Sequence, residues 1–512
     1  MTAYSLSSTR RKRPYLYGLC KTLYCGVLFG WVLLGGLVAC TQAERATPPS
    51  TENNPQGFAS RIAENTRAFL RALPDRRGKP TAYDSAQEAK SGFFQTPKTD
   101  DGRVRIGLLL PSGAEDETVQ AIATSLLNAA QLALFDINQP AITLLIKDTK
   151  GTENGAIEAA QRAIQEGAKL LIGPVFGTSA KAIAPLAKKA NVPVLTFSND
   201  RKIAQSGLWV IGFLPEQNLD RIIAEARAQG LVRFAALIPQ TPYGERIETA
   251  LRPIITRYSG ELVQVEYYQE QAQSMFDPVQ RLAHYESRKQ AWAEEQERLY
   301  KEAELLVPED TPPETLLETL AEFDPIMKAE LDALALTETF GELPYDAVLM
   351  PEGGIKLRSL APLLPYFDVD PRQIRFLGTG LWDDPALGQE PPLIGGWYAA
   401  PDPSTWRNFT KRFEQIFGYT PPRLASLAYD SISLAAALIA IDEKNPFTHA
   451  LLTNADGFAG IDGIFRLTED GLNERGLAVL EIRRKRAHII SKAPKSFVPL
   501  DRARLYAPNF AN

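Results

Sequence analysis

The chain has 512 residues with a formal net charge of −5, and 45% of its residues are apolar. This length is typical of two or three domains, and the apolar content is enough for a large core. The negative charge argues against a nucleic-acid partner, because phosphate backbones attract basic surfaces. The three histidines stand far apart without cysteine neighbours, so we expect neither a bound metal nor a cofactor; they are His284, His449 and His488.

The first forty residues have the three parts of an export signal. Four basic residues at 10–13 precede an apolar run, Val27–Val38, which glycines interrupt and which is short for a membrane span. The run ends in Leu37-Val38-Ala39-Cys40, which resembles the lipobox of bacterial lipoproteins. The resemblance implies a signal peptide at 1–39 and a lipidated Cys40 that tethers the mature chain to a membrane. The alternative is an uncleaved N-terminal anchor.

Residues 40–103 are rich in Pro, Thr, Asn, Gln and charge, which indicates a flexible tether. Folding begins at Val104, where apolar strands alternate with helical segments. Strands that are apolar throughout and separated by helices predict a parallel sheet covered on both faces. In this first series we expect strands at Val104–Leu110, Ile142–Asp148, Lys169–Gly173 and Val192–Phe197, with helices at Thr118–Asn138, Asn154–Glu166 and Ser179–Ala190.

A second series of the same kind follows Pro215, so the fold class is α/β with two doubly wound units in tandem. Residues 282–342 interrupt this series with charged helical sequence. They are either a charged helical hairpin packed on one lobe or an arm that docks a partner. In the second series we expect strands at Val232–Ile238, Glu261–Tyr267, Tyr345–Met350 and Ile374–Gly378, with helices at Asn218–Gln229, Gly244–Tyr258, near Leu357–Leu364 and at Ala425–Ile441.

No catalytic constellation stands out in the sequence. Gly378-Thr379-Gly380 begins like a dinucleotide fingerprint, but Asp383 stands where the third glycine is needed. Residues 173–181 lack the Gly-Lys-Ser/Thr order of a phosphate-binding loop. Ser112 and Ser198 have no glycine elbow, and the few histidines make a hydrolase triad improbable. We therefore expect that the protein is not an enzyme.

Hydroxyl side chains recur at the turns that follow the predicted strands. Pro111-Ser112-Gly113 follows the first strand, residues 175–179 follow the third, and residues 196–200 follow the fourth. Ligands of open α/β sheets bind outside the carboxyl ends of strands, and hydroxyls beside free helix amides suit an anion. Each such turn can equally be a plain helix N-cap. Both interpretations stay open at this point.

Seven short segments, taken in chain order, resemble the type I periplasmic solute-binding proteins, the leucine-binding protein family. They are RIGLLLPS at 105–112, Ile172-Gly173-Pro174, VPVLTFS at 192–198, Tyr243-Gly244, GYTP at 418–421, AYDS at 428–431 and GIDG at 460–463. The resemblance covers about 104–485 and implies a two-lobed clamshell, each lobe a mostly parallel sheet with helices on both faces. The implied divisions are lobe 1 at 104–213 and 402–453, lobe 2 at 214–401 and 454–490, and a C-terminal tail at 491–512.

The resemblance also implies a site for a small, amino-acid-like ligand. The groups that take the ligand carboxylate match Thr178, Ser179, Thr196 and Ser198, with Ser112 on the neighbouring turn, and an aromatic group that lines the cleft matches Tyr243. The family places an acidic residue for the ligand ammonium after the strand that matches 374–378. This chain has no acid there, and Asp383 is a shifted substitute. Burying an ammonium group without a carboxylate partner costs on the order of several kcal/mol of binding free energy.

The lipobox, the tether, the segment RIGLLLP and the helical insertion look most like one sub-branch, the penicillin-binding-protein activator lipoproteins. These use the solute-binding fold to contact a peptidoglycan synthase. Thr41, rather than Asp, follows Cys40, which resembles the pattern sorted to the outer membrane. We expect a non-catalytic activator of a peptidoglycan synthase at the periplasmic face of the outer membrane. The alternative is the substrate-binding component of an amino-acid ABC transporter, whose partner is a permease.

Overall fold

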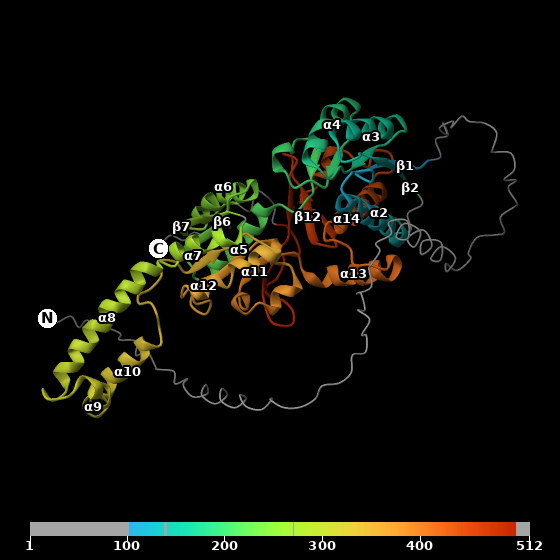
Figure 1. Cartoon of the computed structure of the whole chain (residues 1–512). Helices are drawn as coiled ribbons and strands as arrows, with labels where there is room; N and C mark the ends of the chain where they lie inside the picture. The colour runs from blue at the N-terminus through green and yellow to red at the C-terminus, as the bar shows by residue number, and fades with distance from the viewer. Residues whose placement is uncertain (1–101, 138–140, 270, 498–512) are drawn as a thin grey trace, which may run out of the picture. The chain divides into compact units, whose positions relative to one another are not determined.

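The computed structural model describes residues 102–137, 141–269 and 271–497. The signal peptide, the lipidation site Cys40, the tether up to residue 101 and residues 498–512 of the predicted tail lie outside the described residues. The described chain forms two α/β lobes, a small three-stranded sheet and a helical insertion (Figure 1). The predicted fold class is confirmed, because each lobe holds a mostly parallel sheet with helices on both faces.

The first lobe is built on a fully parallel five-stranded sheet in the order β2-β1-β3-β4-β5. Residues 106–110 of β1 are all buried, so both faces of this strand are covered, as its uninterrupted apolar sequence requires. The strands are β1 (Val104–Leu110), β2 (Ile142–Asp148), β3 (Leu170–Ile172), β4 (Val194–Thr196) and β5 (Leu208–Val210).

Helices cover this sheet on both faces. One core cluster joins α2 to α14, and a second joins α3 to α4, with the strands between them. Within the described residues α2 is the one helix long and apolar enough to cross a membrane, but its inward side packs on α14 as core. The helices are α2 (Glu117–Ile137), α3 (Glu153–Gln165), α4 (Gly177–Ala190), α13 (Pro403–Phe417), α14 (Ala425–Ile441) and α15 (His449–Leu452), with the 3₁₀ turn η2 (Arg201–Ile203).

The second lobe is built on a seven-stranded sheet in the order β15-β14-β10-β9-β8-β6-β7. The five strands from β10 to β7 run parallel, and β14 and β15 are added antiparallel at one edge. The strands are β6 (Arg233–Pro239), β7 (Glu261–Tyr268), β8 (Ala347–Leu349), β9 (Arg375–Gly378), β10 (Trp397–Ala400), β14 (Ala478–Glu481) and β15 (His488–Ser491).

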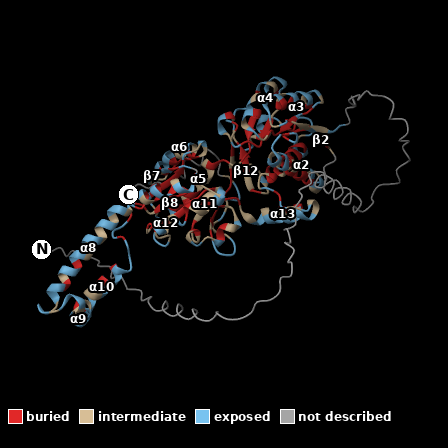
Figure 2. Cartoon of the chain, in the orientation of Figure 1, coloured by how far each residue is buried: buried red, intermediate tan, exposed pale blue. Residues whose placement is uncertain are grey.

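The helices of the second lobe also divide between the two faces of its sheet. One core cluster includes α5 and α6, and the other includes α7, α11 and α12. Both sheets appear as buried centres between half-exposed helices (Figure 2). The helices are α5 (Pro215–Ala228), α6 (Pro242–Arg257), α7 (Phe276–Leu282), α11 (Gly354–Leu360) and α12 (Leu363–Tyr366), and the 3₁₀ turns are η3 (Ala272–Met275), η5 (Gly380–Trp382), η6 (Pro385–Gln389) and η7 (Pro391–Leu393).

A three-stranded antiparallel sheet follows α15, made of β11 (Phe458–Gly460), β12 (Gly463–Leu467) and β13 (Asn473–Arg475). Asn473 Nδ2 donates to the carbonyls of Val210 and Gly212, so β13 lies against the segment that leaves the first sheet. The sequence placed 454–490 with the second lobe, but Phe465 and Leu467 lie in the core of the first lobe. Their apolar side chains pack on the α14 side of that core, which the sequence does not reveal.

Residues 282–342, which we call the arm, form α8 (Tyr285–Leu306), the 3₁₀ turn η4 (Pro313–Thr315), α9 (Leu316–Phe323) and α10 (Pro325–Ala335). The three helices contact one another. Their core consists of arm residues alone, and its buried members are Leu299, Ala303, Leu320, Leu331 and Leu334. The arm therefore has three helices in place of the expected hairpin, and they share a core of their own.

Candidate functional site

The predicted hydroxyls of the first lobe lie on turns that meet at the carboxyl edge of its sheet. A Cβ placed on Gly177 would lie 3.2 Å from Ser198 Oγ, so the start of α4 touches the turn after β4. A Cβ placed on Gly151 would lie 3.3 Å from the Ala114 Cβ and 3.6 Å from the Phe176 ring. The structure thus brings together the turns that follow β1, β2, β3 and β4.

Most of these hydroxyls are bonded to the protein's own backbone. Thr196 Oγ1 donates to the Pro174 carbonyl at 2.7 Å and accepts from the Ser198 N–H at 3.2 Å. Ser198 Oγ accepts from the Asp200 N–H at 3.0 Å, and Ser179 Oγ donates to the Thr152 carbonyl at 3.3 Å. These three side chains hold the turns in place. A ligand would have to replace the bonds that Thr196 and Ser179 donate, whereas the Ser198 hydroxyl accepts its bond and keeps its own proton to donate.

Ser112 belongs to a turn that is fixed by Asp148 at the end of β2. The Asp148 carboxylate accepts the N–H of Gly113 at 2.9 Å and that of Lys150 at 2.8 Å. Burial alone would raise the pKa of Asp148, but these amides and the Ser112 hydroxyl outweigh it and hold the pKa below its ordinary value. Ser112 therefore supports a structural carboxylate.

Thr178 differs from its neighbours because it is exposed on the first turn of α4. Phe176, the N-cap of α4, makes no side-chain capping bond, whereas Thr152 caps α3 by accepting from the Gly155 N–H. The first amides of α4 therefore remain open to an anion, which is the chemistry expected of a helix N-terminus.

Tyr243 lies at the corresponding edge of the second sheet, in the first turn of α6. Its hydroxyl is 3.2 Å from Thr379 Oγ1, and burial raises the pKa of Tyr243 to about 12. A Cβ on Gly244 would lie 1.9 Å from the Pro239 carbonyl oxygen, so this turn requires glycine. Within the described residues no hydrogen bond links Tyr243 to the hydroxyls of the first lobe.

Asp383, the substitute for the ammonium-binding acid, is already paired with a cation of the protein. It follows η5 in the second lobe, and its Oδ2 lies 3.3 Å from Nη1 of Arg423, which precedes α14 in the first lobe. Arg423 Nη2 lies 2.7 Å from Oδ1 of the fully buried Asp462. Burial raises the pKa of Asp383, and Arg423 opposes that effect. One guanidinium thus joins carboxylates from two different parts of the fold.

The ion pairs of Arg423 continue into a partly buried charge cluster, which we define as Asp383, Arg423, Asp430, Asp462 and Arg475. Asp430, Asp462 and Arg475 are buried, whereas the side chains of Asp383 and Arg423 are about a quarter exposed. Asp430 Oδ1 accepts from the Ile461 N–H at 2.7 Å. Burial, and then the negative charge of Asp462, raise the pKa of Asp430. Arg475 donates to the Ile211 carbonyl at 2.9 Å, and burial lowers its pKa. The cluster therefore connects η5, α14, the turn between β11 and β12, and β13.

Three comparisons with known proteins place this geometry in context. A family model described as periplasmic binding protein matches residues 103–286. An uncharacterised protein of Rickettsia prowazekii (strain Madrid E) is 23% identical over 199 residues, which are 39% of this chain and 52% of the relative. The chain thus spans about half the length of that relative.

Solved structures extend the likeness over both lobes. A branched-chain amino acid ABC transporter periplasmic ligand-binding protein of Burkholderia xenovorans LB400 has a TM-score of 0.54 and 14% identity over 78% of this chain and 96% of its own. An ABC transporter substrate-binding protein of Sphaerobacter thermophilus has a TM-score of 0.52 and 16% identity over 78% of this chain and 99% of its own. The fold is that of the type I periplasmic binding proteins.

Within this periplasmic-binding-protein fold, the sequence identified the hydroxyl turns but not the charge cluster. Arg423 and Arg475 were not predicted as site residues, and Asp430 and Asp462 entered only as parts of motifs. A signal was present in the sequence, because Asp430 interrupts the apolar helix Ala425–Ile441. A carboxylate buried in such a helix requires a hydrogen-bonding or charged partner.

A groove of about 1600 Å³ lies beside the charge cluster. Arg475 lines it, together with residues 200–202 and the first turns of α5 and α6. On its wall Glu216 accepts two bonds of 2.7 Å from Arg246. Burial alone would raise the pKa of Glu216, but the Arg246 bonds outweigh it and lower the pKa. Glu216 and Arg246 on this wall are therefore already paired with each other.

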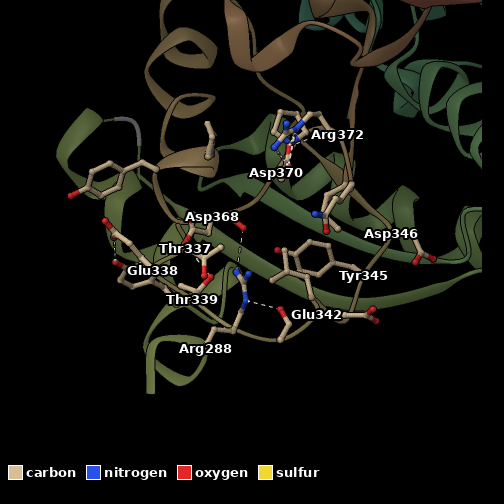
Figure 3. Close-up of a pocket in the computed structure, with 18 of the residues that line it drawn as sticks. Arg288, Thr337, Glu338, Thr339, Glu342, Tyr345, Asp346, Asp368, Asp370 and Arg372 are labelled. Atoms are coloured by element: carbon tan, nitrogen blue, oxygen red, sulfur yellow. Dashed lines mark hydrogen bonds and ion pairs between the residues drawn. The ribbon is translucent and has the colours of Figure 1, made fainter. Parts of the chain in front are cut away.

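A second cavity, of about 1040 Å³, lies at the opposite edge of the second sheet, where the arm joins it (Figure 3). Several of its charged side chains have partners within the protein. Arg233 pairs with Asp346 at 2.7 Å, and Arg288 donates to the carbonyls of Asp368 and Gly341. None of the predicted site residues lines this cavity, so it is not the predicted ligand site. Within the described residues there is no group of three potential metal ligands.

Proposed function

We propose that this chain is a non-catalytic periplasmic lipoprotein that acts by binding a protein partner, a peptidoglycan synthase. It would be held at the periplasmic face of the outer membrane through a lipidated Cys40. The observation that carries the proposal is the ion pair between Asp383 and Arg423. In the leucine-binding pattern an acid after the matching strand receives the ligand ammonium. In this chain the candidate carboxylate is Asp383, and Arg423 of the protein itself already pairs with it.

The energetics of this pairing disfavour an amino-acid ligand. For an ammonium to reach Asp383, Arg423 would have to leave a carboxylate, and Arg423 also serves the fully buried Asp462. Breaking a buried ion pair from one side costs about 3–5 kcal/mol. The Thr196 and Ser198 hydroxyls already bond to the backbone. The candidate carboxylate Asp383 is therefore engaged by a cation of the protein itself, which suits a protein whose lobes do not bind a free amino acid.

Two measurements test the proposal. Isothermal titration with leucine, isoleucine and valine should show no binding to the mature chain, and pull-down from cross-linked cells should recover a peptidoglycan synthase. Amino-acid binding together with recovery of a permease and no synthase would reverse the conclusion. The lipid anchor is tested separately by fractionating wild type and the Cys40→Ala variant. Equal solubility of the two proteins would refute the anchor.

A substrate-binding component of an amino-acid ABC transporter is the second candidate. The open amides of α4 and the exposed Thr178, next to the turn of Ser198, favour it because they suit a carboxylate. A matched pair of probes decides the point: leucine, and 4-methylpentanoate, which is leucine without its ammonium. Under this candidate leucine binds, and Ser198→Ala weakens it about ten- to a hundredfold, as expected for a bond to a charged group. Under the first proposal neither probe binds.

A further inference from the structure

The arm has a large net negative charge for its length. Residues 282–342 hold sixteen carboxylates and five Lys or Arg residues, a net charge of −11, whereas the whole chain has −5. The rest of the chain has a net charge of +6, and five of its basic residues stand in the predicted signal peptide 1–39, so the rest of the mature chain is nearly neutral at +1. The excess of carboxylates over basic residues is therefore concentrated in this one segment.

Few of these carboxylates are neutralised inside the arm. Lys328 pairs with Asp332, Lys301 with Glu297, and Arg298 with Glu295 and Glu302. Several others have no ion pair with any described residue, and these are Glu304, Glu309, Asp310, Glu314, Glu318, Glu322 and Glu330. Negative charges held this close repel one another. Binding of a cationic partner relieves that repulsion and is therefore favoured.

The arm also exposes large apolar side chains that its own core does not use. Seven of the eighteen exposed large apolar residues of the described chain lie between Tyr300 and Phe340. Leu305 is 85% exposed at the end of α8, and Phe323 and Ile326 are 59% and 73% exposed where α9 meets α10. These helices contact one another, and the arm surface is largely exposed (Figure 2). Apolar groups amid unpaired carboxylates indicate an interaction surface.

Unpaired carboxylates together with exposed apolar side chains favour one kind of binding partner for the arm. A second copy of the arm would bring −11 against −11, and an anionic lipid surface would be repelled in the same way. A segment with lysine or arginine on one face and apolar side chains on the other satisfies both features. We propose that the arm is a docking surface for a basic, amphipathic segment of a partner protein. This inference rests on the proposed function, since it places the contact with that partner on the arm.

The first test uses two fluorescent helical peptides with the same leucine positions, one with lysine and one with glutamate at the polar positions. The lysine peptide should bind the mature chain with an affinity that falls as salt rises, and the glutamate peptide should not bind. Phe323→Ser with Ile326→Ser should weaken the lysine peptide at least tenfold. Ile355→Ser is the matched control, because Ile355 is 81% exposed on α11 of the second lobe.

The same titrations contain the outcomes that overturn the inference. If the double serine variant binds as tightly as wild type, the attraction is charge alone and no docking surface exists. If wild type self-associates in sedimentation and the variant does not, the surface belongs to a second copy. Circular dichroism checks that the helices persist, which is expected because both substituted side chains point into solvent.

A photo-cross-linker at position 326 in cells separates this inference from the proposed function. Capture of a synthase through a basic segment supports both. Capture of a different protein through such a segment supports the docking surface and contradicts the synthase. If pull-down recovers the synthase equally with wild type and with the double serine variant, the proposed function stands and the docking surface is wrong.

Discussion

The charge cluster and the arm use the same side chains in opposite ways. In the cluster, Asp462 is fully buried and shares Arg423 with Asp383, so each carboxylate has a fixed cation within reach. In the arm, Glu309 and Asp310 are exposed and have no ion pair with any described residue. The first arrangement joins four elements of the fold, and the second leaves its charges to solvent or to a partner.

The difference shows how environment decides what a charge contributes. A buried carboxylate has lost its water and depends on the protein for replacement, so removing its partner is costly. An exposed carboxylate keeps its water, and its interactions are weak and screened by salt. The cluster should therefore control stability, and the arm should control association.

The largest effect is expected from Arg423→Met. This change removes the cation from Asp383, whose side chain is a quarter exposed, and from Asp462, which is fully buried and depends on it. The free energy of unfolding should fall by about 3–5 kcal/mol. Urea unfolding followed by circular dichroism measures it.

Arg412→Met is the matched control for that experiment. Arg412 pairs with Asp136, but its side chain is half exposed. Its loss should cost at most about 1 kcal/mol, as for other surface pairs. Equal losses in the two variants would contradict the distinction between the cluster and the surface.

The second effect is expected inside the arm, from Leu320→Ala. Leu320 is fully buried in a core made of arm residues only. Truncating a buried leucine costs about 2–5 kcal/mol, and here the loss should be local to the three helices. Hydrogen exchange should therefore accelerate in α8, α9 and α10 and stay unchanged in β1 and β6. Equal acceleration in β1 would mean that the arm unfolds together with the lobes.

The third effect is a pH dependence that belongs to Asp430. Burial and the charge of Asp462 raise its pKa to about 7 from an ordinary value of 3.8. Between these values the folded state keeps a proton that the unfolded state loses, so stability falls as pH rises. Asp430→Asn cannot ionise and should lack this fall, which is at most about 1.4 kcal/mol per pH unit. Thermal unfolding of both proteins from pH 4 to pH 7 measures it, and parallel curves would contradict the assignment.

The sequence predicted the parts of the fold that are long, apolar and local. The strand Ile142–Asp148 and the helix Ala425–Ile441 were predicted with the bounds that the structure shows. The strands β5, β10, β11, β12, β13, β14 and β15 were not predicted, and all of them except the five-residue β12 have only three or four residues. Strands of that length are defined by their pairing partners, which periodicity cannot supply.

The candidate site was likewise predictable only where it depends on local sequence. The turns with Thr178 and Ser198 follow from the ends of parallel strands, which must share one edge of the sheet. The partner of Asp383 did not follow, because Arg423 and Asp462 come from other elements of the fold. Whether a hydroxyl bonds to its own turn or faces a ligand likewise depends on its distance from the nearest backbone group, which the sequence does not give. For Thr196 that distance is 2.7 Å to the Pro174 carbonyl.

The smallest effect is expected from Lys328→Gln on α10 of the arm. Lys328 pairs with Asp332 one turn later, at 2.5 Å. Such pairs contribute about 0.2–0.5 kcal/mol, and the order with lysine first is the weaker one. The loss should be detectable by hydrogen exchange in the arm at low salt and should vanish at high salt, because the pair is solvent-exposed on the Asp332 side. The loss in Arg423→Met should persist at high salt, since counterions do not reach buried carboxylates. A salt-independent loss in Lys328→Gln would place that pair with the cluster and remove the contrast between the two regions.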